Sequence, residues 1–173
     1  MKTIAIDILS PDTIVKAIDE LNQYKKDLEN KVNRLLQLMT ASGAEIVRAK
    51  IVEMGAYATG ELLSGVVGYY SPSLNAGFVR VTSDHVAFVE FGTGVKGQTS
   101  PHKNGEYLSK AAWSYASGSH IFTTQNGRTG WFYPKDDGTF RFTEGMASRP
   151  FMYETALQLK NEFPRIAREV FAT

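Results

Sequence analysis

The sequence predicts an α+β fold, with an antiparallel sheet of about four or five strands between a long N-terminal helix and a C-terminal amphipathic helix. Apolar residues recur at helical spacing over residues 11–54 and again over residues 150–171. Between them, residues 55–149 hold short runs rich in valine, phenylalanine and tyrosine, separated by turn-forming residues. The chain has the length of one domain, so residues 1–173 are expected to form a single domain with these three parts.

The composition limits the classes of function. Apolar residues make up 43% of the chain, which is enough material for a core. The net charge of +1 argues against a dedicated nucleic-acid binder, which usually carries a basic stripe. The absence of cysteine excludes disulfides, thiol nucleophiles and cysteine-ligated zinc. No run approaches the roughly 20 apolar residues that cross a bilayer, so we expect a protein made and used in the cytoplasm, without a membrane partner.

The first residues predict a strand and then a helix. Isoleucine at every second position of residues 2–9 is typical of a half-buried strand. Ser10, Pro11 and Asp12 then signal a helix start, because a serine hydroxyl can cap free amides and proline suits the first helical position. The acid at the third of these positions favours the positive end of the helix dipole.

The predicted N-terminal helix carries an apolar stripe with heptad-like spacing, interrupted once at Lys25. A stripe over about four heptads favours packing along another long helix, and packing on the chain's own sheet is the alternative that stays open. The pair Ser42-Gly43 is expected to weaken or bend the helix before residues 44–54 resume it. The stripe consists of Ile14, Ile18, Leu21, Leu28, Val32, Leu35 and Met39.

The middle of the chain changes in texture. Residues 62–70 and 77–82 predict two strands joined by a turn-rich loop. Residues 92–105 are polar and rich in glycine, and predict a long surface loop that orders on contact with a neighbouring subunit. Residues 106–115 predict a short helix.

The last third predicts a hairpin and a closing helix. Residues 130–134 and 139–143 flank a Lys-Asp-Asp-Gly turn, which is a hairpin signal. Residues 150–171 have the periodicity of an amphipathic helix, which Pro164 is expected to kink or divide.

Two patterns resemble ligand-binding sites but lack the surrounding sequence that such sites require. Gly92 to Gly97 fits G-x-G-x-x-G, but the residues that follow do not predict the helix that a dinucleotide site requires, so a flexible turn is the better interpretation. His85, His102 and His120 lie in different segments without metal-ligand spacing, and we expect solvated side chains. No cofactor or metal is predicted.

Glu90 is an acidic residue inside the apolar run of residues 86–91. A carboxylate among such neighbours costs free energy unless it is paired. One hypothesis is a small hydrolase, in which Glu90 is a general acid or base beside His85 or His102. The interpretation that we favour is structural: Glu90 accepts hydrogen bonds from the turn amides of residues 92–94, or pairs with an arginine.

The aromatic hairpin offers a second alternative. Trp131 and Tyr133 could stack nucleic-acid bases if basic side chains gathered beside them. Basic residues are thin within the hairpin, so a core or subunit contact is the better interpretation. The basic residues that a nucleic-acid-binding module would use are Lys96, Lys103, Lys110 and Arg128.

Three segments occur in a recognisable order: T-G-E-L at residues 59–62, V-A-F-V-E-F-G-T-G at 86–94 and G-M-A-S-R-P-F-M at 145–152. Together they resemble the HK97 gp10-like family of bacteriophage neck and tail-completion proteins, over about residues 11–171. In that family, helical segments precede the first motif and follow the last. The positions that match are Thr59, Gly60, Glu90, Phe91, Gly92, Thr93, Gly94, Pro150 and Phe151.

This resemblance implies a structural head–tail connector without catalytic residues. It implies self-association into a ring, and contact with head-closure, tail-terminator or tail-tube subunits. The protein would then lie in the host bacterial cytoplasm during assembly and in the virion afterwards, where the lumen of the ring would see passing DNA. The expected assembly surface consists of the apolar stripe of residues 14–39, Trp131, Tyr133 and the terminal helix, and free subunits are expected to be monomeric or weakly associated.

Overall fold

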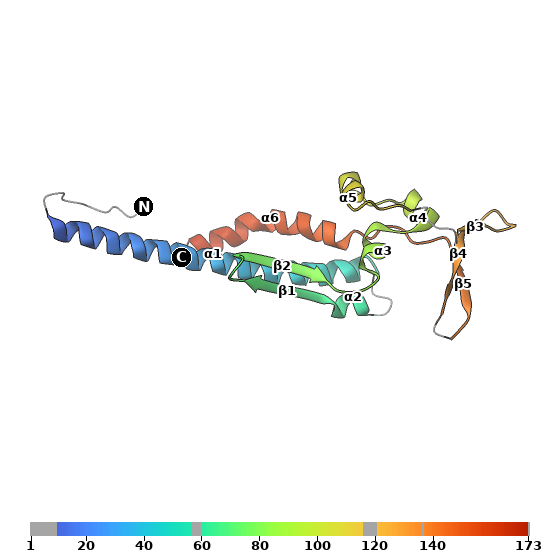
Figure 1. Ribbon diagram of the computed structural model, residues 1–173, viewed down its shortest axis with the longest axis horizontal. Helices are drawn as coiled ribbons and strands as arrows, with labels where there is room; N and C mark the ends of the chain where they lie inside the picture. Colours follow the sequence, from blue (N-terminus) through green and yellow to red (C-terminus); the bar gives the residue numbers. More distant parts are fainter. Residues whose placement is uncertain (1–9, 57–59, 116–120, 136, 173) are drawn as a thin grey trace.

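The computed structural model describes residues 10–56, 60–115, 121–135 and 137–172 of the chain. It confirms a mixed fold with a long N-terminal helix and a C-terminal helix. The molecule is elongated, with one end of the first helix projecting on one side and a separate small sheet on the other (Figure 1). The strand predicted at residues 2–9 lies outside the described residues.

Helix α1 (Pro11–Glu53) is a single unbroken helix of 43 residues, about 65 Å long. It begins where predicted, but the side chain of Ser10 does not cap it. Instead, the carbonyl oxygen of Ser10 accepts hydrogen bonds from the backbone N–H (3.1 Å) and the hydroxyl (2.8 Å) of Thr13. The first turn of the helix is thus held by hydrogen bonds from Thr13 rather than by a serine cap.

Helix α1 is not interrupted at Ser42-Gly43, where the sequence predicted weakening or bending, because it continues through both residues. Gly43 is buried, and a side chain there would lie 3.0 Å from Val79 and 3.3 Å from Leu159. Its small size therefore lets neighbouring elements approach the helix. A glycine that looks like a helix breaker in the sequence is here a packing residue.

A two-stranded hairpin packs on the C-terminal half of α1 (Figure 1). Strands β1 (Val66–Ser71) and β2 (Ala76–Val81) are antiparallel, with Val66 opposite Val81. The predicted first strand starts later than expected, because its first residues form the short helix α2 (Glu61–Ser64).

Helix α6 (Phe151–Phe171) lies antiparallel to α1, and the Ser42 hydroxyl donates a hydrogen bond to Glu162 across the pair (3.2 Å). The helix starts directly after Pro150 and passes through Pro164 without being divided. Pro164 is exposed, so the hydrogen bond that proline cannot donate is lost on the solvent side of the helix rather than in the core.

The second sheet has three antiparallel strands, β3 (Phe122–Thr123), β4 (Thr129–Pro134) and β5 (Phe140–Thr143), and is called the arm below. The predicted β4–β5 hairpin is confirmed, whereas β3 was not predicted. A single sheet of four or five strands is wrong: the described strands divide into sheets of two and three. Each hairpin pairs locally, and the described chain between them includes short helices.

That intervening chain holds three short helices, α3 (Val86–Phe91), α4 (Gly94–Thr99) and α5 (Gly105–Lys110). The prediction of a long surface loop at residues 92–105 is therefore wrong. Several of its residues are buried, because glycines there allow close backbone contact. Helix α5 is shorter than predicted, and its first turn is capped by the Asn104 side chain, which accepts from Tyr107 N–H (3.1 Å).

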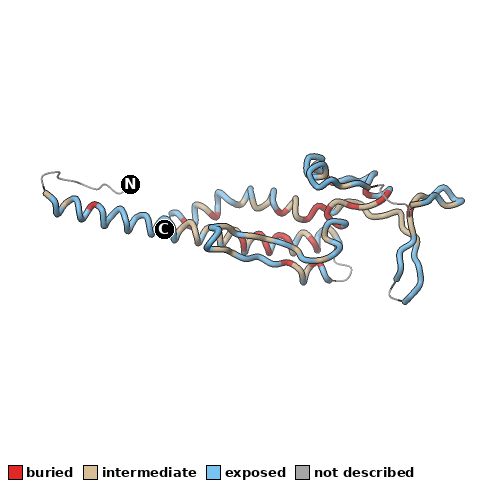
Figure 2. Tube along the Cα trace, in the orientation of Figure 1, coloured by how far each residue is buried: buried red, intermediate tan, exposed pale blue. Residues whose placement is uncertain are grey.

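The core lies where the C-terminal half of α1 meets the hairpin, α3 and the start of α6 (Figure 2). The projecting half of α1 and the arm hold few buried residues. The buried cluster consists of Ala44, Val47, Ile51, Ala56, Leu62, Val66, Val89 and Phe151.

Candidate functional site

The second and third sequence motifs meet in space through their backbones. Thr93 N–H donates to the Met146 carbonyl oxygen (2.8 Å), and Met146 N–H donates back (3.1 Å). Beside this bridge, Arg149 N–H donates to the Val89 carbonyl oxygen (2.9 Å). Segments separated by more than fifty residues of chain are thereby joined into one unit, called the Glu90 junction below.

The Glu90 carboxylate lies at the centre of this junction and is only 5% exposed. Its Oε2 accepts from Met152 N–H (2.9 Å), and its Oε1 accepts from Tyr153 N–H (3.0 Å). These amides belong to the first turn of α6, where N–H groups lack intrahelical partners and the dipole favours a negative charge. The expectation that Glu90 bonds to the turn of residues 92–94 or to an arginine is wrong, because Glu90 caps α6.

The His102 side chain lies against the same carboxylate. Its Nε2 is 3.3 Å from Glu90 Oε1, and its Nδ1 accepts from Asn104 N–H (3.1 Å). This pattern suits the tautomer with the proton on Nε2, which then donates to Glu90. The rings of Phe91 and Tyr153 enclose the imidazole, each with its centroid 5.3 Å away. His102 is 3% exposed, so the prediction of a solvated histidine is wrong.

Burial raises the pKa of Glu90 above its ordinary value of 4.5. The amide hydrogen bonds from Met152 and Tyr153 and the neighbouring His102 oppose this rise, since each favours the ionised carboxylate. Desolvation is the largest of these effects, so the pKa lies higher than in solvent.

The glycines of the second motif permit the close contact. Gly92 and Gly94 have φ of 81° and 61°, a region that favours glycine. A side chain at Gly94 would lie 2.6 Å from the Glu144 carbonyl oxygen and 2.7 Å from the Trp131 ring. The junction therefore depends on both the conformation and the small size of these residues.

The first and last motif positions have simpler places. Thr59 lies outside the described residues, and Gly60, with φ 72°, precedes α2. Pro150 is buried at the start of α6, and Phe151 is completely buried in the core. Gly60 lies outside the junction, whereas Pro150 and Phe151 lie within it, between Arg149 and Met152.

Hydrogen bonds to α6 engage both oxygens of Glu90. His85, the other histidine of the hydrolase hypothesis, is exposed and contacts Phe88 rather than the junction. Among the described residues, no group of three or more histidine or acidic side chains could hold a metal ion. The arrangement can fix the start of α6 against α3, and this favours the structural interpretation of Glu90.

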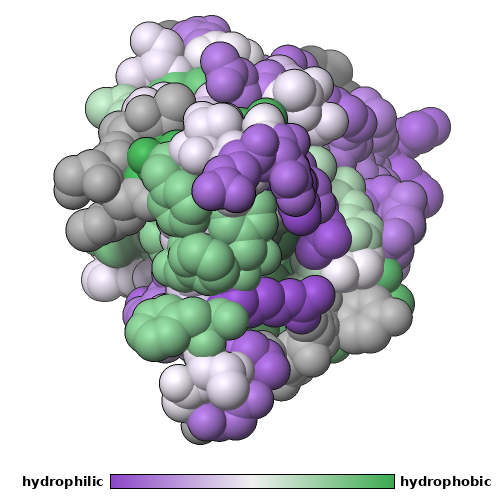
Figure 3. Space-filling model, turned by 90° about the vertical axis from the view of Figure 1, so that its right-hand side faces the viewer, coloured by the Kyte–Doolittle hydropathy of each residue, from purple (hydrophilic) through white to green (hydrophobic). Residues whose placement is uncertain are grey.

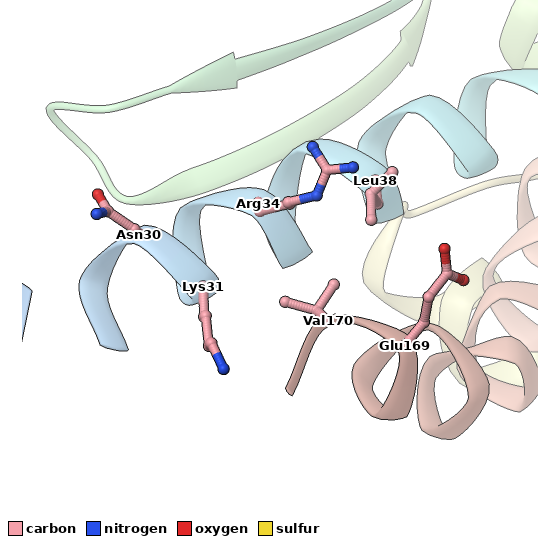
Figure 4. Close-up of a pocket in the computed structure, with 6 residues that line it drawn as sticks. All are labelled: Asn30, Lys31, Arg34, Leu38, Glu169 and Val170. Carbon is pink, nitrogen blue, oxygen red and sulfur yellow. The ribbon is translucent and has the colours of Figure 1, made fainter. Parts of the chain in front are cut away.

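Two shallow cavities lie away from the junction. One, of about 300 Å³, is formed by four residues of α1 and two of α6 (Figure 4). The other, of about 390 Å³, lies between α1 and the β1–β2 turn and includes Leu28 and Val32. Both cavities therefore lie near the middle of α1, where its contacts with α6 and the β1–β2 hairpin begin. The residues of the first are Asn30, Lys31, Arg34, Leu38, Glu169 and Val170.

The apolar stripe of α1 is divided between two environments. Val32, Leu35 and Met39 are half-buried, in the part of α1 that faces the hairpin and α6. Over residues 11–30, all but Thr13 and Ala17 are exposed. The second half therefore packs on its own chain, as one alternative expected, whereas the intersubunit contact of the first half stays a prediction. The exposed stripe residues are Ile14 (40%), Ile18 (51%), Leu21 (53%) and Leu28 (42%).

The arm carries a second apolar surface, formed by phenylalanines of the aromatic hairpin for which the sequence predicted a core or subunit contact. Phe132 lies opposite Phe142, and the ring of Phe122 stacks on that of Phe132 at 5.6 Å. With Phe140, which is 68% exposed, these residues form the Phe face of the arm. Viewed from this end, green apolar atoms gather in a patch beside purple polar ones (Figure 3).

The predicted hairpin residues lie on the other face. Trp131 is half-buried beside Gly94, and Tyr133 is 38% exposed opposite Arg141. The signal for the Phe face was the alternation of phenylalanine along both strands, which becomes a surface only once the register is known.

The basic residues of the nucleic-acid alternative are mostly paired within the chain. Lys103 contacts Glu154 (2.5 Å), Lys110 contacts Glu106 (2.7 Å) and Arg128 contacts Glu144 (2.9 Å). These pairs raise the pKa of Lys103 and of Arg128. No specific observation favours a nucleic-acid site over a protein-contact surface.

Comparison with known proteins finds no matching family model, no matching curated protein and no matching solved structure. The resemblance to the HK97 gp10-like family therefore stays a prediction. Of the helices that the structure describes, none is both long and apolar enough to cross a membrane.

Proposed function

We propose that this chain is a structural component of a tailed bacteriophage, a neck or tail-completion protein that joins head and tail by assembling into a ring. The observation that carries the proposal is the pair of exposed apolar surfaces, the α1 stripe and the Phe face, at opposite ends of one elongated subunit (Figures 1 and 2). A closed ring needs two different surfaces on each subunit. Exposed apolar patches bordered by polar residues commonly mark protein contacts.

The Glu90 junction supports the same proposal. A subunit that bears load between head and tail needs a fixed connection between its two contact surfaces. The junction links the arm to α6, and α6 packs along α1, so the two surfaces are held on one continuous frame. The residues of the second and third motifs then serve this frame, which is consistent with a connector that has no catalytic residues.

Under this proposal, the partners are further copies of the chain and head-closure, tail-terminator or tail-tube subunits. The protein acts in the host bacterial cytoplasm during assembly and in the virion afterwards. DNA contact is limited to non-specific passage through the ring.

The proposal is tested by deleting the gene from the phage or prophage that carries it and inducing lysis. We expect electron microscopy to show DNA-filled heads and separate tails, with joined particles restored by a plasmid copy of the gene. Normal yields of infectious, joined particles from the deletion would exclude the function. A plasmid copy with Phe132→Asp should fail to restore joining, whereas Thr99→Ala, an exposed change outside both surfaces, should restore it.

A further inference from the structure

The β1–β2 hairpin has an open edge along β1. This strand lies on the side of the hairpin away from α6, and none of the described strands pairs with its outer side (Figure 1). Gly68 is exposed at this edge, although its inner side touches α1, where a side chain would lie 3.1 Å from Ala44. Exposed edge strands are usually protected by their own charged residues or proline, and the sequence of β1 has neither. The edge is therefore suited to receive another strand.

The register of the hairpin shows which backbone groups of β1 are available. Thr82 N–H donates to the carbonyl oxygen of Gly65 (3.0 Å), and these two residues lie opposite each other when the β1–β2 register is extended by one position. Hydrogen-bonded pairs alternate along an antiparallel ladder. The N–H and C=O groups of Gly68 and Tyr70 consequently point away from β2, toward the open edge.

The arm has an open edge of the same kind. Among the described strands, β5 pairs with β4 alone. Lys135 N–H donates to the carbonyl oxygen of Thr139 (2.8 Å), which lies opposite it when the β4–β5 register is extended. By the same alternation, Phe140 and Phe142 direct their backbone groups away from β4. Each edge thus offers the N–H and C=O groups of two residues, at the same spacing.

The geometry points to the pairing of these two edges: β5 of one copy adds antiparallel to β1 of a second copy. In the register that matches the available groups, Phe142 lies opposite Gly68. Phe140 then lies opposite Tyr70, and each pair exchanges both of its hydrogen bonds. This inference rests on the proposed ring, and it specifies which strands join neighbouring copies. The contact is heterologous, so every copy uses both edges and the chain of contacts can close.

The side chains of the two strands are complementary in this register. Directly opposite residues lie on the same face of a sheet, so the ring of Phe142 fills the space that Gly68 leaves beside α1. An aromatic ring in this position stabilises an edge glycine. On the other face, the exposed Arg141 lies opposite Tyr69, which is 43% exposed. A guanidinium beside a tyrosine ring is a favourable contact.

The charges beside the paired residues favour the antiparallel direction. The same register places Glu144 opposite Val66, whose carbonyl oxygen accepts from the Arg48 guanidinium (3.1 Å). Within its own copy, Arg48 is paired with Glu45 (2.8 Å). Glu144 is likewise paired with Arg128 (2.9 Å). The contact therefore brings two ion pairs together with opposite charges facing each other, whereas a parallel pairing would carry Glu144 away from Arg48.

The length of the strands sets the strength of the contact. Strand β5 has four residues, about 13 Å of ladder. Such short additions are marginal by themselves in water. Two separate copies therefore associate weakly, and the contact persists once ring closure gives every copy two of them.

The absence of cysteine makes a direct test available. The contact places Tyr69 and Arg141 in a pair without hydrogen bonds, with Cα atoms about 4.5 Å apart, which a disulfide can span. A tagged Tyr69→Cys chain and an untagged Arg141→Cys chain are mixed in equal amounts at high concentration, oxidised and separated by mass. We expect the mixed disulfide dimer to exceed either same-variant dimer by about tenfold, well above the twofold excess of random pairing. Val67→Cys with Thr143→Cys is the second pair, should either first variant fail to fold by circular dichroism.

The control pairs Tyr69→Cys with Tyr133→Cys, which lies opposite Arg141 on the same face of the arm, one strand further from the edge. The contact places its Cα about 10 Å from that of Tyr69, beyond the reach of a disulfide. An excess of Tyr69→Cys dimers would overturn the inference in favour of β1–β1 pairing, and an excess of Arg141→Cys dimers in favour of β5–β5 pairing. Mixed dimers no more abundant than in the control would show that the two edges do not pair.

The two proposals fail separately, because the cross-linking uses purified protein and the deletion uses the virus. Mixed dimers with normal virions from the deletion would leave this contact standing and remove the head–tail role. Separate heads and tails with no mixed dimers would do the reverse.

Discussion

The Glu90 carboxylate accepts a hydrogen bond at 3.0 Å from the backbone N–H of Tyr153, 63 residues later in the chain. The same carboxylate binds the preceding amide, so one side chain fixes the start of α6. Since α6 is the element that packs along α1, its first turn sets the position of the whole helix pair. The stability of the subunit should therefore depend more strongly on Glu90 than is usual for a single polar residue.

Replacing Glu90 with alanine is expected to lower the free energy of unfolding by about 2–3 kcal/mol, because buried N–H groups lose their acceptor and a void remains. Glu90→Gln keeps the shape of the side chain but places an amide N–H against one of the N–H groups that Glu90 accepts from. It should lower the free energy of unfolding by about 1 kcal/mol. Urea unfolding followed by circular dichroism measures both changes. Glu106→Ala removes a carboxylate that is exposed and paired with Lys110, and should leave the urea midpoint nearly unchanged.

The pH dependence of Glu90 follows from its raised pKa. Because the folded state holds this proton more tightly than the unfolded state, the contribution to stability is fully present below pH 4.5 and is lost as the pH rises through the folded pKa. Wild type should therefore gain stability relative to Glu90→Gln as the pH is lowered from about 7 to about 4. Carbon NMR of the Glu90 carboxyl should show its titration above 4.5, and a midpoint at or below this value would contradict the burial argument.

Gly94→Ala tests the close contact between the two motifs. Its positive φ and the Glu144 carbonyl oxygen 2.6 Å from the added carbon predict a loss of about 2 kcal/mol or more. Gly105→Ala is the matched control, because nothing lies within 4 Å and the residue opens a helix. That change should be neutral or stabilising by up to about 1 kcal/mol. Equal losses from both variants would show that the glycine effect is not specific to the junction.

The sequence predicted the elements that depend on neighbouring residues. The long helix, the β1–β2 and β4–β5 hairpins and the closing helix all follow from local periodicity and turns. The partners of Glu90 did not, because the nearest amides in sequence were those of residues 92–94 and the true ones lie in α6. The polarity of residues 92–105 suggested a loop, since composition cannot distinguish a flexible glycine from one buried by close backbone contact. For His102, no sequence signal indicated burial.

Alanine substitution of two phenylalanines should affect different properties: stability for Phe151 and assembly for Phe140. Phe151 is completely buried, so Phe151→Ala should lower the free energy of unfolding by about 3–5 kcal/mol through lost burial and a cavity. Phe140 is 68% exposed on the Phe face, so Phe140→Ala should change monomer stability by less than about 0.5 kcal/mol. If the Phe face is an assembly surface, the second variant should nevertheless join fewer heads to tails, at unchanged protein level. Thermal unfolding of purified protein and particle counts by electron microscopy give the two readings. A marked loss of stability in Phe140→Ala would mean that the face belongs to the subunit's own core, and normal joining by that variant would remove its part in assembly.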